Sequence, residues 1–537
     1  MQFRVKQPLF SRAGEVSSVK ISEYELNNLK LAFFKDSPTG LSLTKFITAQ
    51  KSDTEDTFTA LYSSEDTSLP GYVVAFANVD DNLETNSSSP FEVVIDASKV
   101  ETYLPMSSVR YFTEDGKPVF YTKLERKNFI EGSPTEIILE RMVAKATLNR
   151  SENCDIPDVY VFHNAQPIAL ELIIDGWGIS MTDAATFMMK NIRNFTYSQL
   201  QQELGSNGEN WKWNHDYGDM AYSFSNNSSD TSFPVFHWAC SLNYDLVEFP
   251  SGDESVVNTV DFIKYSDIIN NPIEDNSTEP TPLYLNETTR PGKMYGARNA
   301  LPLVAIAAHY EIKDSRERIS FMREGDMIFT EAEYETLMPR RQSSIFMKGS
   351  FGIEKITTEQ FWELCESRYP DREFQSYIEN MGKNETLAAG YVAPLLKNIT
   401  AENVPSGFCN AEGLELDFSD PEVCKKINLE LIESCGLMEY YKDGCCVFEM
   451  PVRHLRDLKD GNEATGCYGI VRNHHYELLL SSVSGWGRGI PDKEWLIEEE
   501  GVAPGVKPYR LNCKLSIVPW TVYDNGDIDI IEDAEDE

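Results

Sequence analysis

The residues best suited to metal binding or catalysis lie in a few short motifs of this 537-residue chain. His474 and His475 are adjacent, and neighbouring residues of a strand point to opposite faces, so we do not expect them to bind one ion together. The ten cysteines lack the C-x-x-C spacing of a zinc site, and Cys445 and Cys446 are simply adjacent. No G-x-S-x-G or H-E-x-x-H motif is present. The sequence therefore predicts no metal, no cofactor and no catalytic residues, with the cysteines either buried thiols or, in an exported protein, partly joined in disulfides.

Two loops have part of the pattern of a ligand-binding loop and lack the rest. Residues 485–489 do not complete G-x-G-x-x-G, and the segment from Ile490 does not continue as the helix that a phosphate site needs. Residues 80–84 resemble the start of a calcium loop, but Thr85 stands where that loop needs glycine and Phe91 where it needs an acid. We interpret both as surface turns.

The composition excludes several classes of protein. The formal net charge is −38, which repels nucleic acid and anionic membrane surfaces, so no nucleic-acid partner is expected. Hydrophobic residues make up 41% of the chain, enough for folded cores in several domains. No apolar run reaches the ~18 residues of a membrane helix, and no leader pattern follows Met1. We expect either a cytosolic protein or an exported one whose leader is missing.

The spacing of apolar residues is mostly two, which is typical of strands with one face on a core. Strands are expected over residues 1–6, 141–148, 170–174, 303–308 and 511–517. Clusters of Gly, Pro, Asn, Asp and Ser separate them, so the sequence predicts a mainly β fold of sandwich type. A few short helices are expected, at residues 197–204, 357–365 and 419–431.

A domain boundary is expected near residue 195, where an apolar stretch ends and an asparagine-rich stretch begins. The two expected domains are residues 1–195 and 196–537.

Arg12, which precedes Ala13, lies between the first short strand and a polar stretch. An arginine before small residues in such a link is a good protease target, although an ordinary loop arginine looks the same.

Several segments, in order along the chain, resemble the fimbrillins of Bacteroidales bacteria, specifically the Mfa-type major subunits of protease-matured type V pili. Each segment is short, and the ordered set is more specific than any one of them. The chain departs from the family at Cys445 and Cys446, in long inserts around residues 205–285, and in its acidic tail after Ile530. The matching segments are residues 11–14, 72–79, 140–146, 440–444, 452–454, 466–484 and 511–522.

The resemblance implies two transthyretin-like β-sandwich domains and assembly by strand exchange. A lipoprotein precursor would be exported through the outer membrane to a cell-surface fimbria, with its leader upstream of Met1. An arginine-specific protease would cut between Arg12 and Ala13, so that the first strand leaves. The apolar residues of that strand are Met1, Phe3 and Val5. A neighbouring subunit's C-terminal segment would replace it, through Leu511, Cys513, Leu515 and Ile517.

The partners implied by the resemblance are further copies of the chain, accessory or anchor pilus subunits, the protease and host surface ligands. A shaft subunit needs both an acceptor groove and a donor strand, and the candidate donor favours this role in adhesion. A tip or accessory adhesin that binds a host protein or glycan needs only the groove, and stays open. A secreted carbohydrate-active enzyme would need a cleft with two carboxylates at glycosidase separation, and the absent motifs disfavour it.

Overall fold

The computed structural model describes only part of the chain, and the fold is given for that part. Met1, Arg12 and Ala13, the expected helix at 197–204 and residues 80–93 lie outside it. The described residues are 2–6, 23, 25–38, 40–52, 57–62, 69–79, 94–99, 102–109, 111–112, 118–129, 134–191, 239–244, 259–275, 280–289, 301–337, 342–368, 391–392, 407–417, 420, 422–423, 426, 438–452, 469–494 and 510–519.

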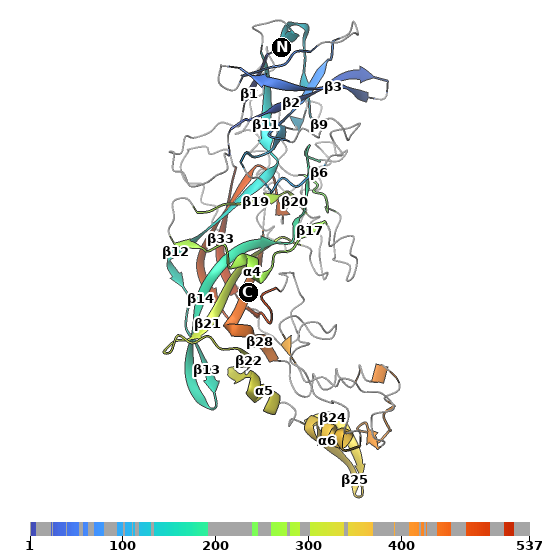
Figure 1. Cartoon of the computed structure of the whole chain (residues 1–537), viewed down its shortest axis with the longest axis vertical. Coiled ribbons are helices and arrows are strands. Elements are labelled where there is room, and N and C mark those ends of the chain that lie inside the picture. The colour runs from blue at the N-terminus through green and yellow to red at the C-terminus, as the bar shows by residue number, and fades with distance from the viewer. Residues whose placement is uncertain are drawn as a thin grey trace, which may run out of the picture.

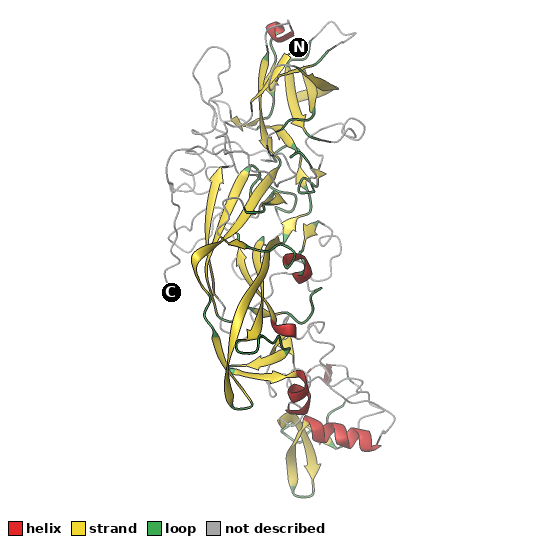
Figure 2. Ribbon diagram, turned by 60° about the vertical axis from the view of Figure 1, so that its left-hand side comes forward, coloured by secondary structure: helices red, strands yellow, loops and turns green. Residues whose placement is uncertain are grey.

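The molecule is elongated and built mainly from strands, which confirms the predicted fold class (Figures 1 and 2). The N-terminal strands form one end, two further sheets form the middle, and a small group around α6 (Thr358–Arg368) forms the other end (Figure 1). Among the described residues, no helix is long and apolar enough to cross a membrane.

The N-terminal strands form a closed ring of sheet. Their order is β10-β5-β2-β3-β4-β1-β11-β7, and a further pairing of β5 with β7 closes the ring and leaves β10 beside it. The strands are β1 (Gln2–Lys6), β2 (Leu29–Ser37), β3 (Gly40–Lys51), β4 (Thr57–Thr59), β5 (Tyr72–Ala77), β7 (Met106–Ser108), β10 (Thr122–Lys123) and β11 (Thr135–Arg141). Buried side chains such as Leu31, Phe33, Phe58, Ile137 and Leu139 form one apolar core of this ring.

The chain passes from the first sheet to the second at Met142. β12 (Val143–Asp155) follows β11 almost without a break and pairs in parallel with β31 (His474–Ser484). β14 (Gln166–Ser180) pairs with β21 (Leu303–Ile312), far beyond the expected boundary at residue 195. The main-chain N–H of Cys240 donates to the carbonyl of Asn191 at 2.7 Å. The two residues that flank the intervening stretch therefore lie side by side. We therefore propose that the division lies at Met142 and that the asparagine-rich stretch is an insertion.

Two facing sheets form the second sandwich, with one core between them that contains Trp177, Ile306, Phe448, Tyr476 and Leu480. The first sheet contains β18 (Glu274–Asp275), β12, β31 and β33 (Arg510–Pro519), and β19 (Leu283–Asn286) also pairs with β12. The second runs in the order β26 (Tyr391–Val392), β28 (Met438–Tyr441), β22 (Phe321–Glu324), β23 (Met327–Thr330), β13 (Val159–His163), β14, β21, β29 (Cys445–Pro451) and β32 (Arg488–Gly489).

The described helices are short, as expected. α6 begins with a capping pair: the N–H of Gln360 donates to Thr357 Oγ1 at 3.1 Å, and the N–H of Thr357 donates to Gln360 Oε1 at 2.9 Å. This confirms the helix predicted at 357–365, which packs on β24 (Gln342–Gly349), β25 (Gly352–Thr357) and β27 (Phe408–Cys409). The other short elements are β6 (Val94–Ile95), β8 (Tyr111–Phe112), β9 (Pro118–Val119), β15 (Thr182–Asp183), β16 (Thr186–Phe187), β17 (Val260–Asp261), β20 (Thr288–Thr289), β30 (Gly469–Ile470), α4 (Tyr265–Ile268), α5 (Glu331–Leu337) and the 3₁₀ turns Arg126–Phe129 and Lys442–Gly444.

Candidate functional site: the first strand and the joint between the sheets

The first strand of the chain lies in the interior of its sheet. β1 pairs in parallel with β11, from Phe3 opposite Thr135 to Lys6 opposite Ile138. On its other side it pairs antiparallel with β4, where Arg4 lies opposite Thr57. A strand with ladders on both sides has its main-chain groups paired in both directions, and its removal leaves two edges facing each other. The β1 slot, meaning the space between β4 and β11, is therefore one strand wide.

The neighbours of the β1 slot are apolar. Phe58 of β4 is 1% exposed, and Ile137 and Leu139 of β11 are fully buried. Without β1 these side chains would lose part of their cover, and each apolar side chain that becomes exposed costs roughly 1.5–3 kcal/mol. If β1 leaves, the β1 slot would therefore combine two unpaired edges with an apolar floor.

The candidate donor strand lies in the other sandwich, so the structure does not bring it to β1. Among the described strands, β33 pairs with β31 and forms the edge of its sheet. Its predicted apolar positions lie opposite buried residues of β31. The pairs are Leu511 with Val483, Cys513 with Leu480, Leu515 with Leu478 and Ile517 with Tyr476. The strand predicted over residues 511–517 is therefore present and pairs with β31.

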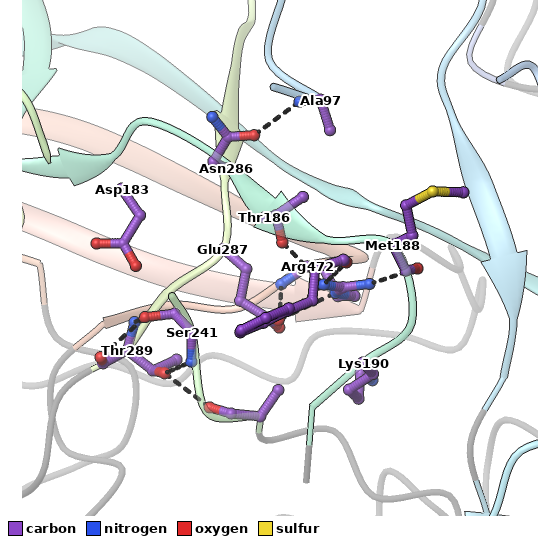
Figure 3. Close-up of polar contacts among 12 residues, drawn as sticks. Ala97, Asp183, Thr186, Met188, Lys190, Ser241, Asn286, Glu287, Thr289 and Arg472 are labelled. Atoms are coloured by element: carbon purple, nitrogen blue, oxygen red, sulfur yellow. Dashed lines mark hydrogen bonds and ion pairs between the residues drawn. The ribbon is translucent and has the colours of Figure 1, made fainter. Parts of the chain in front are cut away.

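A buried ion pair lies at the joint between the two sandwiches. The side chains of Arg472 and Glu287 are both fully buried, with Nε of the arginine 3.0 Å from Oε2 of the glutamate. Arg472 Nη2 also donates to Thr186 Oγ1 at 2.8 Å and to the carbonyl of Phe187 at 2.6 Å (Figure 3). These bonds join β16, the β19–β20 connection and the turn before β31. Most of the hydrogen-bonding capacity of the guanidinium is used within the fold, which indicates a structural role.

The residues next to Arg472 connect the same turn to the end of β11. Asn473 has a left-handed backbone with φ of 60°, which asparagine tolerates better than most residues. Its Oδ1 accepts from the N–H and from Nη1 of Arg141, both at 3.3 Å, and its own N–H donates to the carbonyl of Val143. Lys190 and Glu140 form a second buried pair at 2.7 Å. The segments 140–146 and 466–475, which carry much of the resemblance, therefore meet in one polar joint.

Only the first part of the glycine-rich stretch 485–489 is the turn that the sequence predicts, because Arg488–Gly489 form the buried strand β32. The turn is fixed by aromatic side chains. The hydroxyl of Tyr310 donates to the carbonyl of Trp486 at 3.0 Å, and that of Tyr441 donates to the carbonyl of Gly487 at 3.1 Å. The guanidinium carbon of Arg323 lies 4.6 Å from the centre of the Trp486 ring. No phosphate-binding arrangement results, because the turn carbonyls face donors from the core.

The two adjacent histidines point to different partners, as expected for a strand. Nδ1 of His474 lies 2.8 Å from the carbonyl of Arg472, and Nε2 of His475 lies 2.8 Å from Thr147 Oγ1. Within the described residues no group of three or more histidine, cysteine, aspartate or glutamate side chains is placed to hold a metal. In the same part of the chain, Cys409, Cys445 and Cys446 are free thiols.

The histidines should make stability depend on pH. Burial lowers the pKa of His474 to about 4 and that of His475 to about 3, from an ordinary value of 6.5. As pH falls below about 6.5, the unfolded chain binds protons that the folded chain does not, so each histidine reduces the unfolding free energy by ~1.4 kcal/mol per pH unit. The loss ends near the folded pKa, and above about pH 6.5 the full contribution is present.

We expect His475→Gln to remove one histidine's share of this slope. Its amide can keep a hydrogen bond to Thr147 and does not titrate. Urea unfolding of the wild type and the variant between about pH 7 and about pH 5 measures the difference. Equal slopes for the two proteins would show that His475 does not titrate differently in the folded and unfolded states.

Sequence reasoning found the strands of the site and missed its charged residues. Glu140, Arg141, Lys190, Glu287 and Arg472 were not singled out, although three of them stand inside the motifs used for the resemblance. One feature of the sequence could have pointed to them. Charged residues within otherwise apolar strand segments are rarely tolerated unless they are paired with an opposite charge.

Comparison with known proteins identifies the C-terminal region. The family described as major fimbrial subunit protein type IV, fimbrillin, C-terminal, matches residues 439–526. No curated protein sequence matches the chain. That family region contains β28, β29, β31 and β33, and therefore both the joint turn and the candidate donor strand.

Several solved structures are similar at low identity, with TM-scores too low to support an argument. A candidate cell adhesion protein from Parabacteroides distasonis has 11% identity and a TM-score of 0.35, over 97% of this chain and 96% of that one. A second, from Bacteroides eggerthii, has 9% identity and a TM-score of 0.32 over 97% and 95%. The tip fimbrial protein Mfa3 from Porphyromonas gingivalis, with a C-terminal truncation, has 9% identity and 0.27 over 97% and 100%. Residues 439–526 therefore match the C-terminal region of the fimbrillins, which confirms the resemblance found in the sequence.

Proposed function

We propose that the chain is a structural subunit of a cell-surface fimbria that matures by cleavage after Arg12 and assembles by donor-strand exchange. The observation that carries the proposal is the position of β1, which precedes Arg12 in the sequence and lies in the interior of its sheet, between β4 and β11. All other strands of the ring follow Arg12, so a cut there would separate β1 from the rest of the ring. The family match of residues 439–526 supports the fimbrial role.

The energetics of the β1 slot favour a replacement strand. A buried main-chain hydrogen bond contributes net ~1 kcal/mol, and a buried group left unpaired costs ~1–3 kcal/mol. Loss of β1 removes partners from both β4 and β11. A strand from another subunit restores both ladders, since main-chain bonds give affinity and alternate side chains give register.

The geometry of the link also suits cleavage. Lys6 ends β1 opposite Ile138, while Glu23 is bonded to Arg141 on the same strand β11. These two points lie about 10 Å apart along a strand, whereas residues 7–22 can reach roughly 50 Å. The chain between them is therefore much longer than the connection requires.

The donor on this proposal is the C-terminal segment that contains Leu511, Cys513, Leu515 and Ile517. As an edge strand, β33 is held by a single ladder to β31, so its release breaks pairing on one side only. Exchange from the C-terminal segment of one copy into the β1 slot of the next is head-to-tail and does not close on itself. Such contacts build an open filament.

The remaining roles follow from this assignment. The partners are other copies of the chain, accessory or anchor subunits, an arginine-specific protease and host surface ligands. The precursor is a lipoprotein exported through the outer membrane, and the mature protein acts in adhesion without enzymatic activity.

The test is digestion of the purified full chain with an arginine-specific protease. We expect a new N-terminus at Ala13 by sequencing, and oligomers or filaments by native mass spectrometry and negative-stain microscopy. Arg12→Ala should remain uncut and monomeric. Arg126→Ala is the matched control, because Arg126 is an exposed arginine in a folded 3₁₀ turn, and the cut should be unchanged.

Two results would contradict the proposal. Cleavage only at other arginines would remove Arg12 as the maturation site. A clean cut at Arg12 that leaves a stable monomer would argue against a shaft subunit and favour a tip or accessory adhesin.

A further inference from the structure

The N-terminal ring has a shallow, open pocket of about 380 Å³ beside the hairpin that joins β2 to β3. Pockets that bind small groups commonly have ~300–1,000 Å³ and combine an apolar lining with a few polar groups. β4, which borders the β1 slot, pairs with the far end of β3 at Gln50 and Lys51, roughly 30 Å along the strand. The pocket is therefore separate from the β1 slot. Its lining residues are Asp36, Ser37, Gly40, Leu41, Phe120 and Tyr121.

The floor of this pocket is apolar and largely aromatic. Leu41, Phe120 and Tyr121 are half-buried and pack against an apolar core of the ring that contains Phe34. The centre of the Tyr121 ring lies 4.4 Å from that of Tyr72 and 5.2 Å from that of Phe120, and both contacts are edge-on. Aromatic faces carry partial negative charge, so they attract cations as well as apolar groups.

One carboxylate borders the aromatic floor. Asp36 is exposed, and its Oδ2 accepts from the hydroxyl of Tyr72 at 3.3 Å. Burial, and after it the negative charge of Asp36, raises the pKa of both Tyr72 and Tyr121, so the carboxylate lies near both phenol groups. In the part of the chain that the structure describes, Asp36 is not paired with a lysine or an arginine. Its negative charge is therefore not neutralised by the fold.

These features distinguish between classes of ligand. An anion would be repelled by Asp36 and by the net charge of −38. A sugar needs several polar groups for its hydroxyls, and the Ser37 hydroxyl already donates to the carbonyl of Gly40 at 2.7 Å. A basic side chain suits the pocket, because its charge can contact both the carboxylate and a ring while its methylene groups pack on apolar surface.

We propose that the pocket at Asp36 binds a lysine or arginine side chain of a partner protein. The charged end of that side chain contacts Asp36 and the ring of Tyr121, and its methylene groups pack on Leu41 and Phe120. The acidic surface of the chain attracts the same basic partner at longer range. The inference goes beyond the proposed fimbrial role, because it needs neither cleavage after Arg12 nor strand exchange.

The test is binding of Nα-acetyl-lysine amide and Nα-acetyl-arginine amide to the uncut full chain, measured by saturation-transfer NMR and calorimetry. We expect a Kd of about 1 mM, because one exposed ion pair with one cation–π contact is weak. Asp36→Asn and Tyr121→Leu should each weaken binding about fivefold. Asp314→Asn is the matched control, since it removes the same charge from an exposed turn of the second sandwich, and it should bind as the wild type.

A neutral probe and a longer probe examine the two parts of the inference. Nα-acetyl-norleucine amide has a similar stem without the charge and should bind at least about fivefold more weakly than the lysine probe. Equal binding of the two would overturn the proposal. The same lysine within a five-residue glycine peptide should bind at least as well as the lysine amide. Clearly weaker binding of the peptide would mean that the pocket admits a small amine but not a protein side chain, which would overturn the partner.

Other results would also contradict the proposal. Binding of methyl β-glucoside that persists in Asp36→Asn and is lost in Tyr121→Leu would assign the pocket to sugars. No binding of either basic probe at about tenfold above the expected Kd would mean that the pocket has no such ligand. Circular dichroism checks the fold of each variant. If Tyr121→Leu is unfolded, Asp36→Asn and the norleucine probe still decide the question.

Discussion

Replacing Arg472 by methionine is expected to lower the unfolding free energy by about 3–5 kcal/mol, because it leaves the buried Glu287 carboxylate without its partner. Both side chains are fully buried, so water cannot take the place of the guanidinium. The substitution also removes the hydrogen bonds from the Arg472 guanidinium to Thr186 and Phe187, which hold β16 in place. Guanidinium chloride unfolding, followed by tryptophan fluorescence and circular dichroism, measures the effect.

The control for this prediction is Arg316→Met. Arg316 pairs with Glu171 at the surface, where its side chain is 59% exposed, and such pairs are worth at most ~1 kcal/mol. The double change Arg472→Met with Glu287→Met should recover part of the lost stability, since replacing a whole buried pair by apolar groups is often tolerated. A loss below ~1 kcal/mol for Arg472→Met would mean that the joint is more hydrated than its burial indicates.

Replacing Gly444 by alanine is expected to destabilise the second sandwich by several kcal/mol, on the order of 3 kcal/mol. Gly444 has φ of 72°, and a Cβ there would lie 2.4 Å from the carbonyl oxygen of Tyr310 and 3.0 Å from its nitrogen. Both are main-chain atoms of the central strand β21, which cannot move without disturbing its ladders with β14 and β29. Thermal unfolding by calorimetry measures the loss.

Gly325→Ala separates the clash from the backbone conformation. Gly325, in the turn between β22 and β23, has φ of 60° and no atom within 4 Å of the added Cβ. It should therefore show only the cost of a left-handed alanine, ~1 kcal/mol. If the two variants lose equal stability, the contact with Tyr310 contributes nothing.

The strands and one helix could be predicted because their signals are local. The alternation over residues 511–517 predicts the strand β33, and the capping residue Thr357 marks the start of α6. The interior position of β1 could not be predicted, because nothing in residues 1–6 says which strands will pair with them. Closure of the ring by β5 and β7 is likewise a long-range pairing.

The polar joint between the two sandwiches could not be predicted from the sequence either, because it also depends on long-range contacts. Arg141 and Asn473 are far apart in the chain and meet only when both sandwiches are formed. The asparagine-rich stretch after residue 195 has the composition of a linker, yet the bond between Asn191 and Cys240 shows that its two ends are adjacent. Composition does not distinguish an insertion from a linker, because both need only be polar and exposed.

The continuity of β11 and β12 has a mechanical consequence. A strand held in the β1 slot lies beside β11, which continues through Met142 into β12, and β12 pairs with β31, which pairs with β33. Tension between an inserted donor and the C-terminal segment of the same subunit would run along these strands. Hydrogen bonds perpendicular to the pulling direction are loaded together rather than one after another. On this proposal, a filament of such subunits would bear tensile load in shear through its sheets, and its rupture would be governed by the rate of strand sliding.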